Sequence, residues 1–231
     1  MDSITFQVGT PANHQEIIEF LNTHFLPHEP MNISIDLLEP GYRIPFFDAM
    51  VSRQLKEAGS LVVLARQRNI LMGLAIFVTE RAGEKAEPEP GLVCPRKLQS
   101  IFRFIERMKS ELDVVSLYGV TQWAEVEFLV CHSEIRVPGL GTELVRIGTN
   151  MLADTGTKVT MTSSEDLKYN PPTLQVVTVH ASSHFSSQIF RKVGFKEVFS
   201  LPFREYQVEG EVVFKTTPPH SEATLFVKCL Q

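Results

Sequence analysis

The sequence predicts a mixed α/β fold in a single domain over residues 1–231, with a mostly antiparallel central sheet flanked by helices. Apolar runs typical of strands alternate along the chain with amphipathic runs typical of helices. The 231 residues are 43% hydrophobic, which is ordinary for a globular protein with one substantial core. No internal repeat or linker divides the chain, so one domain is expected.

The first elements predicted are a strand and two helices. Residues 4–8 alternate like a short strand, and residues 11–25 carry apolar side chains at helical spacing. Two prolines within residues 26–32 break this helix. Helical spacing resumes over residues 46–58 and stops at Gly59. The chain is therefore expected to open as strand, helix, helix.

A hairpin and a third helix are predicted next. Residues 61–65 and 71–78 are strand-like, and the polar residues 66–69 between them indicate a turn. Residues 82–91 form an acidic, proline-bearing surface loop. Residues 96–112 have the pattern of a basic amphipathic helix, whose charges are expected to form a solvated face.

The central part of the chain reads as strand, glycine loop and helix. Residues 126–131 are an apolar run, residues 136–141 contain two glycines, and an amphipathic helix follows to about Ala153. Residues 154–172 are polar and rich in turn formers. Residues 173–179 then predict a buried strand.

The last elements predicted are one helix and two strands. The helix covers residues 182–192 and ends at Gly194, and the strands cover residues 195–199 and 224–228. The order of elements is therefore β-α-α-β-β-α-β-α-β-α-β-β.

The glycine loop is suited to an anion. Glycines at 139 and 141 let the backbone turn tightly and approach a ligand, which a Cβ at either position would obstruct, and the first N–H groups of the following helix have no partner within it. The spacing lacks the third glycine of a dinucleotide-binding fingerprint and the lysine of a Walker loop. We therefore expect a phosphate-bearing ligand of another kind.

The sequence R-V-P-G-L-G at residues 136–141 resembles the R-x-x-G-x-G loop of GCN5-related N-acetyltransferases, which bind the pyrophosphate of acetyl-CoA. The resemblance implies that family's fold and acetyl-CoA as co-substrate. The residues it places against acetyl-CoA are Leu129, Val130, Cys131, Arg136, Val137, Gly139, Leu140, Gly141 and Thr142.

Two further motifs resemble insect-type arylalkylamine N-acetyltransferases, which include the dopamine N-acetyltransferases. Residues 25–32 match F-x-x-D-E-P-L-N, with His28 in place of the aspartate. Residues 181–186 and 193–195 match that family's serine-bearing helix and its L-G-F ending. The resemblance implies acetylation of dopamine, serotonin, tyramine, octopamine or tryptamine, with Glu29, Ser182 and Ser186 as catalytic residues.

Acetyl transfer to an amine needs a base, because an alkylamine with a pKa near 10 is almost wholly protonated at neutral pH. Glu29 has the matching position for that base, and Pro27 and Pro30 hold it on a rigid loop where burial could raise its pKa. Without the resemblance, Glu29 reads as a surface residue of a turn.

Charge that develops on the thioester oxygen and sulfur requires hydrogen-bond donors. Backbone N–H groups of Val130 and Cys131 are the donors that the family usually employs. Cys131 is expected to be a small buried residue, and a ping-pong cysteine mechanism is the alternative. Ser182 and Ser186 share a helix face; a helix-capping role is the stronger alternative for Ser182, and catalysis is the stronger for Ser186.

Three positions depart from the family pattern. Val137 and Pro138 replace the usual residues after the loop arginine, and Pro138 removes an N–H that could meet a phosphate, which predicts weaker cofactor binding. His28 changes the charge beside Glu29. These departures support the alternative of a non-catalytic acyl-CoA-binding module.

Composition limits the kinds of partner that are expected for this chain. A net charge of −5 disfavours nucleic acid or an anionic membrane, and no apolar stretch is long enough to span a bilayer. Three isolated cysteines predict reduced thiols rather than disulfides or a zinc site, and no metal is expected. We expect a cytoplasmic monomer that acts on small molecules, and a polyamine or longer-chain acyltransferase is the alternative enzyme.

Overall fold

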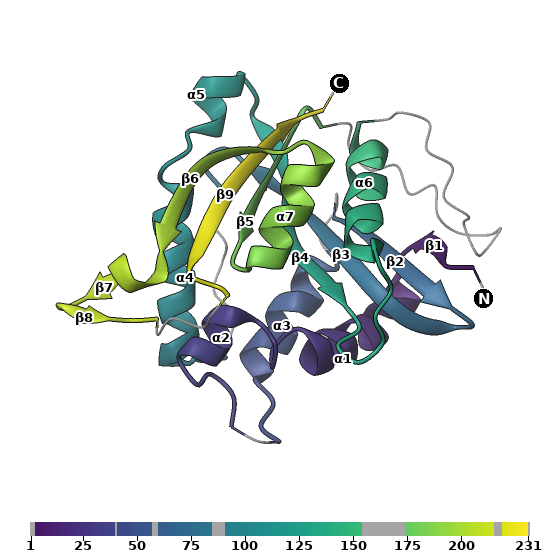
Figure 1. The fold of residues 1–231 in the computed structure, drawn as a ribbon, viewed down its shortest axis with the longest axis horizontal. Coiled ribbons are helices and arrows are strands. Elements are labelled where there is room, and N and C mark those ends of the chain that lie inside the picture. Colours follow the sequence, from purple (N-terminus) through teal and green to yellow (C-terminus); the bar gives the residue numbers. More distant parts are fainter. Residues whose placement is uncertain are drawn as a thin grey trace.

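The computed structural model describes residues 3–39, 41–56, 60–84, 91–153, 174–214 and 219–230 (Figure 1). Its strands are β1 (Thr5–Val8), β2 (Leu61–Gln67), β3 (Ile70–Arg81), β4 (Gln122–Cys131), β5 (Val176–Ala181), β6 (Lys196–Pro202), β7 (Gln207–Val208), β8 (Glu211–Val212) and β9 (Glu222–Cys229). Its α-helices are α1 (His14–His24), α2 (Pro30–Ser34), α3 (Pro45–Gln54), α4 (Arg96–Lys109), α5 (Val114–Tyr118), α6 (Leu140–Leu152) and α7 (His184–Val193). Two short 3-10 helices are η1 (Pro11–Asn13) and η2 (Phe203–Glu205).

Seven strands form the central sheet, in the order β1-β2-β3-β4-β5-β9-β6. Neighbouring strands are antiparallel except β4 and β5, which are parallel. This pair is joined through α6, as a parallel connection requires a crossover. The predicted mixed, mostly antiparallel sheet flanked by helices is confirmed.

Helices cover both faces of the sheet. The core on one face includes buried side chains of α1, α3 and α4, and the core on the other includes those of α6 and α7. Figure 1 shows α6 and α7 crossing the sheet side by side. None of the helices within the described residues is long and apolar enough to cross a bilayer.

The centre of the sheet contains two irregularities that open space for a ligand. β4 pairs with β5 only from Ala124 to Val126, so the later part of β4 separates from its parallel neighbour. The β3–β4 register also skips Glu127, because Phe77 pairs with Val126 and Ile76 with Phe128. Val126 belongs to the core beneath α6, whereas Phe128 belongs to the opposite core. Because of the bulge, the side chains after Glu127 change the face of the sheet on which they lie. Phe128 therefore faces the side of the sheet that α1, α3 and α4 cover.

Most predicted elements are present, with shifted ends. β2 and β3 extend into the predicted turn and leave a two-residue turn, Arg68–Asn69, in which both residues have positive φ. β4 begins at Gln122, four residues before its prediction, and β5 covers Val176–Ala181 instead of 173–179. The helix predicted over 46–58 is α3, Pro45–Gln54.

Five short elements were not predicted: α2, α5, β7, β8 and η2. α2 follows Glu29 although two prolines flank this residue, because Pro30 occupies the first helical position, where its missing N–H has no cost. α5 and the β7–β8 hairpin are too short to show a clear period. The turn-rich segment 154–172, Gly59 and most of the acidic loop lie outside the described residues.

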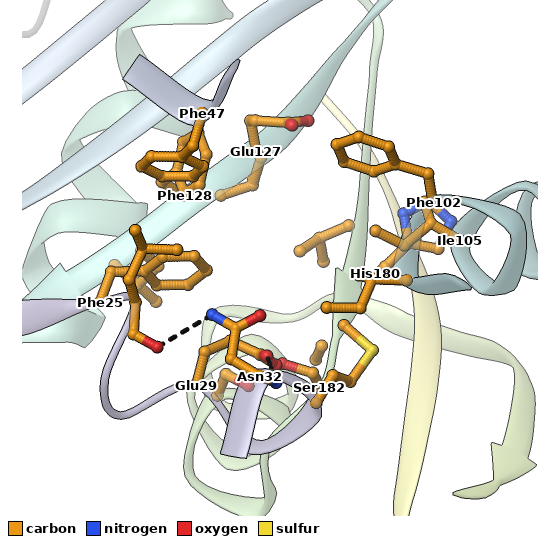
Figure 2. Close-up of a pocket in the computed structure, with 18 of the residues that line it drawn as sticks. Phe25, Glu29, Asn32, Phe47, Phe102, Ile105, Glu127, Phe128, His180 and Ser182 are labelled. Atoms are coloured by element: carbon orange, nitrogen blue, oxygen red, sulfur yellow. Dashed lines mark hydrogen bonds between the residues drawn. The ribbon is translucent and has the colours of Figure 1, made fainter. Parts of the chain in front are cut away.

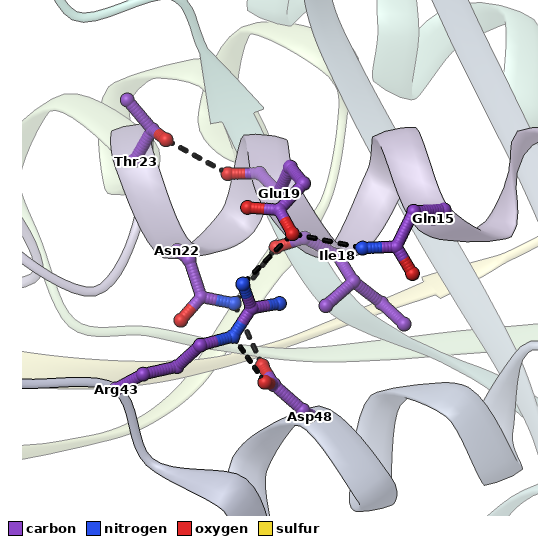
Figure 3. A network of polar contacts seen from close by, with 7 residues as sticks. All are labelled: Gln15, Ile18, Glu19, Asn22, Thr23, Arg43 and Asp48. Atoms are coloured by element: carbon purple, nitrogen blue, oxygen red, sulfur yellow. Dashed lines mark hydrogen bonds and ion pairs between the residues drawn. The ribbon is translucent and has the colours of Figure 1, made fainter.

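A polar network fixes the segment between α1 and α3 (Figure 3). The Arg43 guanidinium forms ion pairs with Glu19 on α1, at 2.7 Å, and with Asp48 on α3. Asn22 Nδ2 donates to Asp48 Oδ1 at 2.7 Å and to the Ile18 carbonyl at 2.9 Å. These contacts contribute little free energy at an exposed position, but they hold the two helices between which Glu29 and α2 lie.

A first prediction concerns Gly148, where α6 lies closest to the sheet. A Cβ at this position would lie 2.2 Å from two ring carbons of Phe77, which is 1% exposed. Although alanine favours a helix, Gly148→Ala is expected to lower the free energy of unfolding by about 1–3 kcal/mol, because the ring has no room to move. Urea denaturation measures this change. Arg146→Ala on the exposed side of α6 is the control, and equal stability of the two variants would contradict the packing.

Candidate functional site

Two cavities lie where β4 and β5 separate. The inner cavity, of about 130 Å³, lies between the sheet and helices α2, α3 and α4 (Figure 2). The outer groove, of about 560 Å³, lies between the glycine loop, α7 and the end of α1. The residues that border both are Phe25, Glu29, Leu129, Ser182 and Ser186. All three predicted catalytic residues are therefore at the junction of the two cavities.

The outer groove brings together all nine residues that the sequence places against acetyl-CoA. They are Leu129, Val130, Cys131, Arg136, Val137, Gly139, Leu140, Gly141 and Thr142. Gly139 is the N-cap of α6 with φ 80°, a left-handed conformation that favours glycine. The N–H groups of the first turn of α6 have no partners within the helix, and the Arg136 side chain is exposed beside them. The groove thus has a site for an anion at the helix N-terminus.

Gly141 has a different role from the one that the sequence suggested. We expected a side chain there to obstruct the ligand. A Cβ at Gly141 would instead lie 2.7 Å from Cδ1 of Ile189 on α7 and 3.7 Å from Sγ of Cys131. The glycine therefore allows α6 and α7 to pack closely, and Gly141→Val would disturb this packing before it reached a ligand.

Glu29 is a buried carboxyl group with one free oxygen. The residue is 6% exposed and is the N-cap of α2, where its Oε2 accepts a hydrogen bond from the Asn32 N–H at 2.7 Å. Asn32 Nδ2 donates to the Leu26 carbonyl at 3.0 Å, which fixes the loop (Figure 2). Oε1 of Glu29 is buried and accepts no hydrogen bond from the described residues.

The pKa of Glu29 is raised because burial disfavours its charged form. The Asn32 N–H, the Ser182 hydroxyl and the Met31 N–H oppose this shift without cancelling it. Its raised pKa makes this carboxyl group a better proton acceptor than an exposed glutamate. His28 is exposed at the edge of the outer groove and is not among the groups that shift the pKa of Glu29.

The cap of α7 does not involve Ser182, which was the expected capping residue. The N-cap of α7 is Ser183, not Ser182: its Oγ accepts from the Ser186 N–H at 3.0 Å. The Ser186 hydroxyl lies 2.8 Å from Ser183 Oγ and donates to the Ser183 carbonyl at 3.0 Å, so it belongs to the same cap. Ser182 precedes the helix and borders both cavities together with Glu29, and its hydroxyl helps to lower the pKa of that carboxyl group.

The cap gives a second prediction. Ser183→Ala is expected to lower the free energy of unfolding by about 0.5–2 kcal/mol, because it leaves N–H groups of α7 without an acceptor. Ser182→Ala, outside the cap, should change stability by much less. Thermal denaturation of both variants measures the difference, and a larger loss for Ser182→Ala would contradict the assignment of the cap.

Cys131 was expected to be buried, but its side chain is exposed in the outer groove. The walls of the groove surround it, and this desolvation raises the pKa of the thiol to about 11, although Arg136 lowers it in part. A thiol with this pKa is protonated at neutral pH and is a poor nucleophile. The geometry therefore favours direct transfer over the ping-pong alternative.

Aromatic side chains form the walls of the inner cavity. Phe25, Phe47 and Phe128 lie on one side and Phe102 and Ile105 on the other (Figure 2). The Phe128 ring meets the Phe25 ring edge to face, with centroids 5.1 Å apart, and the Phe47 ring likewise at 5.9 Å. Composition could not assign these phenylalanines to a cavity rather than to the core.

A charged cluster around the buried carboxyl group of Glu125 adjoins the inner cavity and was missed by sequence reasoning. Lys109, expected on a solvated face of α4, has its Nζ 2.6 Å from Glu125 and 3.1 Å from Glu80. His180 Nδ1 lies 3.0 Å from the other Glu125 oxygen. The only sequence signal was the presence of acidic residues at alternate positions, 125 and 127, within an apolar strand.

No family model matches the chain, whereas solved structures do. Arylalkylamine N-acetyltransferase 2 from Aedes aegypti has a TM-score of 0.81 at 20% identity over 100% of both chains. The polyamine N-acetyltransferase of Drosophila melanogaster has 0.74 at 16%, over 99% of this chain and 100% of that one. Arabidopsis thaliana NAA60 in complex with acetyl-CoA has 0.55 at 12%, over 99% of each. The chain thus has the GCN5-related N-acetyltransferase fold, as the motifs implied.

Proposed function

We propose that this protein transfers the acetyl group of acetyl-CoA to the nitrogen of a small arylalkylamine, by direct attack in a ternary complex. The observation that carries the proposal is the position of Glu29, which borders both the inner cavity and the outer groove. One oxygen of its carboxyl group accepts no hydrogen bond from the described residues. A base at this position reaches an amine in one cavity and a thioester in the other.

The outer groove fits acetyl-CoA. Its left-handed Gly139, the N-terminus of α6 and the exposed Arg136 suit a pyrophosphate, and the separated end of β4 offers backbone groups to the thioester. Its volume, about 560 Å³, suits an extended ligand. These features favour the binding of acetyl-CoA and oppose the loss of affinity that is expected from Pro138.

The inner cavity fits the aromatic part of the amine. A cavity of roughly 150 Å³ with apolar walls holds a benzene molecule, and the inner cavity is of similar volume, about 130 Å³. Its phenylalanines offer faces and edges to a ring. One ring or a short chain fits this space, which argues against long polyamines. In the proposed complex the amine nitrogen lies next to Glu29, which borders both cavities.

An ammonium group loses two protons when it becomes an amide. Glu29 accepts the first, so that the neutral nitrogen can attack, and passes it to solvent. The second leaves the nitrogen as the C–N bond forms at the thioester carbonyl carbon and the C–S bond breaks, and the CoA thiolate takes it up. Ser182 orients the Glu29 carboxyl group, and Ser186 maintains the helix start that positions Ser182. Cys131 has no covalent part in this sequence.

We place this activity in a single-domain cytoplasmic monomer. Release of CoA in a mixture of protein, acetyl-CoA and a panel of amines tests the proposal directly. Turnover with arylalkylamines supports it. Tight acetyl-CoA binding without turnover for any amine would identify a non-catalytic binding module, and turnover with aliphatic diamines alone would identify a polyamine acetyltransferase instead.

A further inference from the structure

Glu127 is a second carboxyl group in the inner cavity and has no part in the proposed reaction. Figure 2 shows it at the opposite end of the cavity from Glu29, Asn32 and Ser182. It occupies the bulge of β4, so that it borders the same cavity as its neighbour Phe128. A substrate with its nitrogen at Glu29 would therefore direct its other end toward Glu127.

The Glu127 carboxyl group has hydrogen-bonding capacity to spare. Among the described side chains only Gln54 donates to it, from Nε2 to Oε1 at 3.2 Å. The nearby cation, Lys109, is engaged by Glu125 and Glu80. A carboxyl group has lone pairs for several donors, so one that borders a cavity can bind a further donor from a ligand.

We infer that Glu127 determines specificity by hydrogen bonding a hydroxyl group on the substrate ring, at the end opposite the amine. This inference rests on the proposed function and narrows its substrate class to ring-hydroxylated arylalkylamines. The phenylalanine walls hold the ring between the two carboxyl groups, which lie at opposite ends of the cavity, so a hydroxyl group that meets Glu127 is one far from the amine-bearing chain, at the para or meta position.

A hydroxyl group suits Glu127 better than a second cation does. Burial and then the neighbouring Glu125 raise the pKa of Glu127, so the cavity favours its protonated form, although Lys109 and Gln54 oppose this. A neutral phenol can bind a carboxyl group in either form. A second ammonium group would have to lose its hydration between apolar walls, which is costly unless the carboxyl group ionises.

The test compares two amines that differ by one hydroxyl group, 2-phenylethylamine and 4-hydroxyphenylethylamine. The wild-type protein is expected to have a kcat/KM at least tenfold higher for the hydroxylated amine. Glu127→Met, which has a similar size but no acceptor oxygen, should bring this ratio close to one. Glu127→Gln, which keeps an acceptor, should give an intermediate ratio.

The control is Glu80→Gln, which changes a carboxylate of the same charged cluster outside the inner cavity and should leave the ratio unchanged. Three results would overturn the inference: a wild-type ratio near one, an equal loss for both amines in Glu127→Met, or a higher kcat/KM for 1,4-diaminobutane that depends on Glu127. If 2-phenylethylamine is acetylated in those cases, the proposed function stands. No CoA release with any amine would refute both.

Discussion

Glu29→Gln is expected to lower kcat by ~10²–10⁴ fold at neutral pH while leaving acetyl-CoA affinity unchanged. The amide keeps the shape of the side chain and an oxygen that can still cap α2 through the Asn32 N–H. It cannot accept the amine proton. Steady-state CoA release measures kcat, and calorimetric titration with acetyl-CoA measures the affinity.

The loss of kcat in Glu29→Gln should become smaller as the pH rises. In the wild-type protein, kcat rises with pH as the Glu29 carboxyl group, whose pKa is raised, loses its proton. The variant has no carboxyl group at this position, so its kcat lacks this rise. At alkaline pH more of the amine is already neutral, so the ratio of the two rates should shrink. Glu84→Gln, a change at an exposed turn, is the control. A Glu29→Gln variant with the wild-type rate at neutral pH would mean that Glu29 only caps α2.

The fold could be predicted because its long elements follow regular periods. The seven strands of the central sheet and the helices α1, α3, α4, α6 and α7 all begin or end within a few residues of their expected positions. The exceptions have local causes. α2 and α5 have five residues each, too few for a hydrophobic period, and the ends of β4 and β5 are fixed by pairing with neighbours far away in the sequence.

The outer groove could be predicted because its residues come mainly from one continuous strand, loop and helix. The inner cavity could not, since it is assembled from the loop between α1 and α2 and from α2, α3, α4, β4, β5 and α7. Glu127 illustrates the difference: it faces the cavity because of a bulge that depends on the register with β3. Likewise, the sequence did not show whether Ser182 or Ser183 caps α7, because the two serines are adjacent and the cap depends on the exact residue at which the helix begins.

Lys109→Met is expected to lower the free energy of unfolding at neutral pH by about 3–5 kcal/mol, the usual cost of leaving a buried charge without its partner. Glu125 has a side chain that is 5% exposed and would retain only His180. Urea denaturation followed by the fluorescence of Trp123, which borders this cluster, measures the change. Lys196→Met, at an exposed position of β6, is the control.

The pH dependence follows from the pKa of Glu125. Burial raises this pKa, but Lys109 and then His180 outweigh the effect and lower it from 4.5 to about 2. A lowered carboxyl pKa stabilises the folded state fully above the unfolded value, and this stabilisation is lost as the pH falls through the folded value. The difference between the wild-type protein and Lys109→Met should therefore be largest above pH 4.5 and shrink toward pH 2.

The double variant Lys109→Met with Glu125→Gln shows how much of the lost stability comes from the unpaired charge of Glu125 and how much from lost packing of Lys109. Because it removes both charges, it should be more stable at neutral pH than Lys109→Met alone, and its difference from the wild-type protein should vary less with pH. If instead the double variant loses the sum of the two single changes, the ion pair contributes no coupling. Lys109 would then stabilise α4 through its aliphatic chain, and Glu125 would need no cation to remain buried beside the inner cavity.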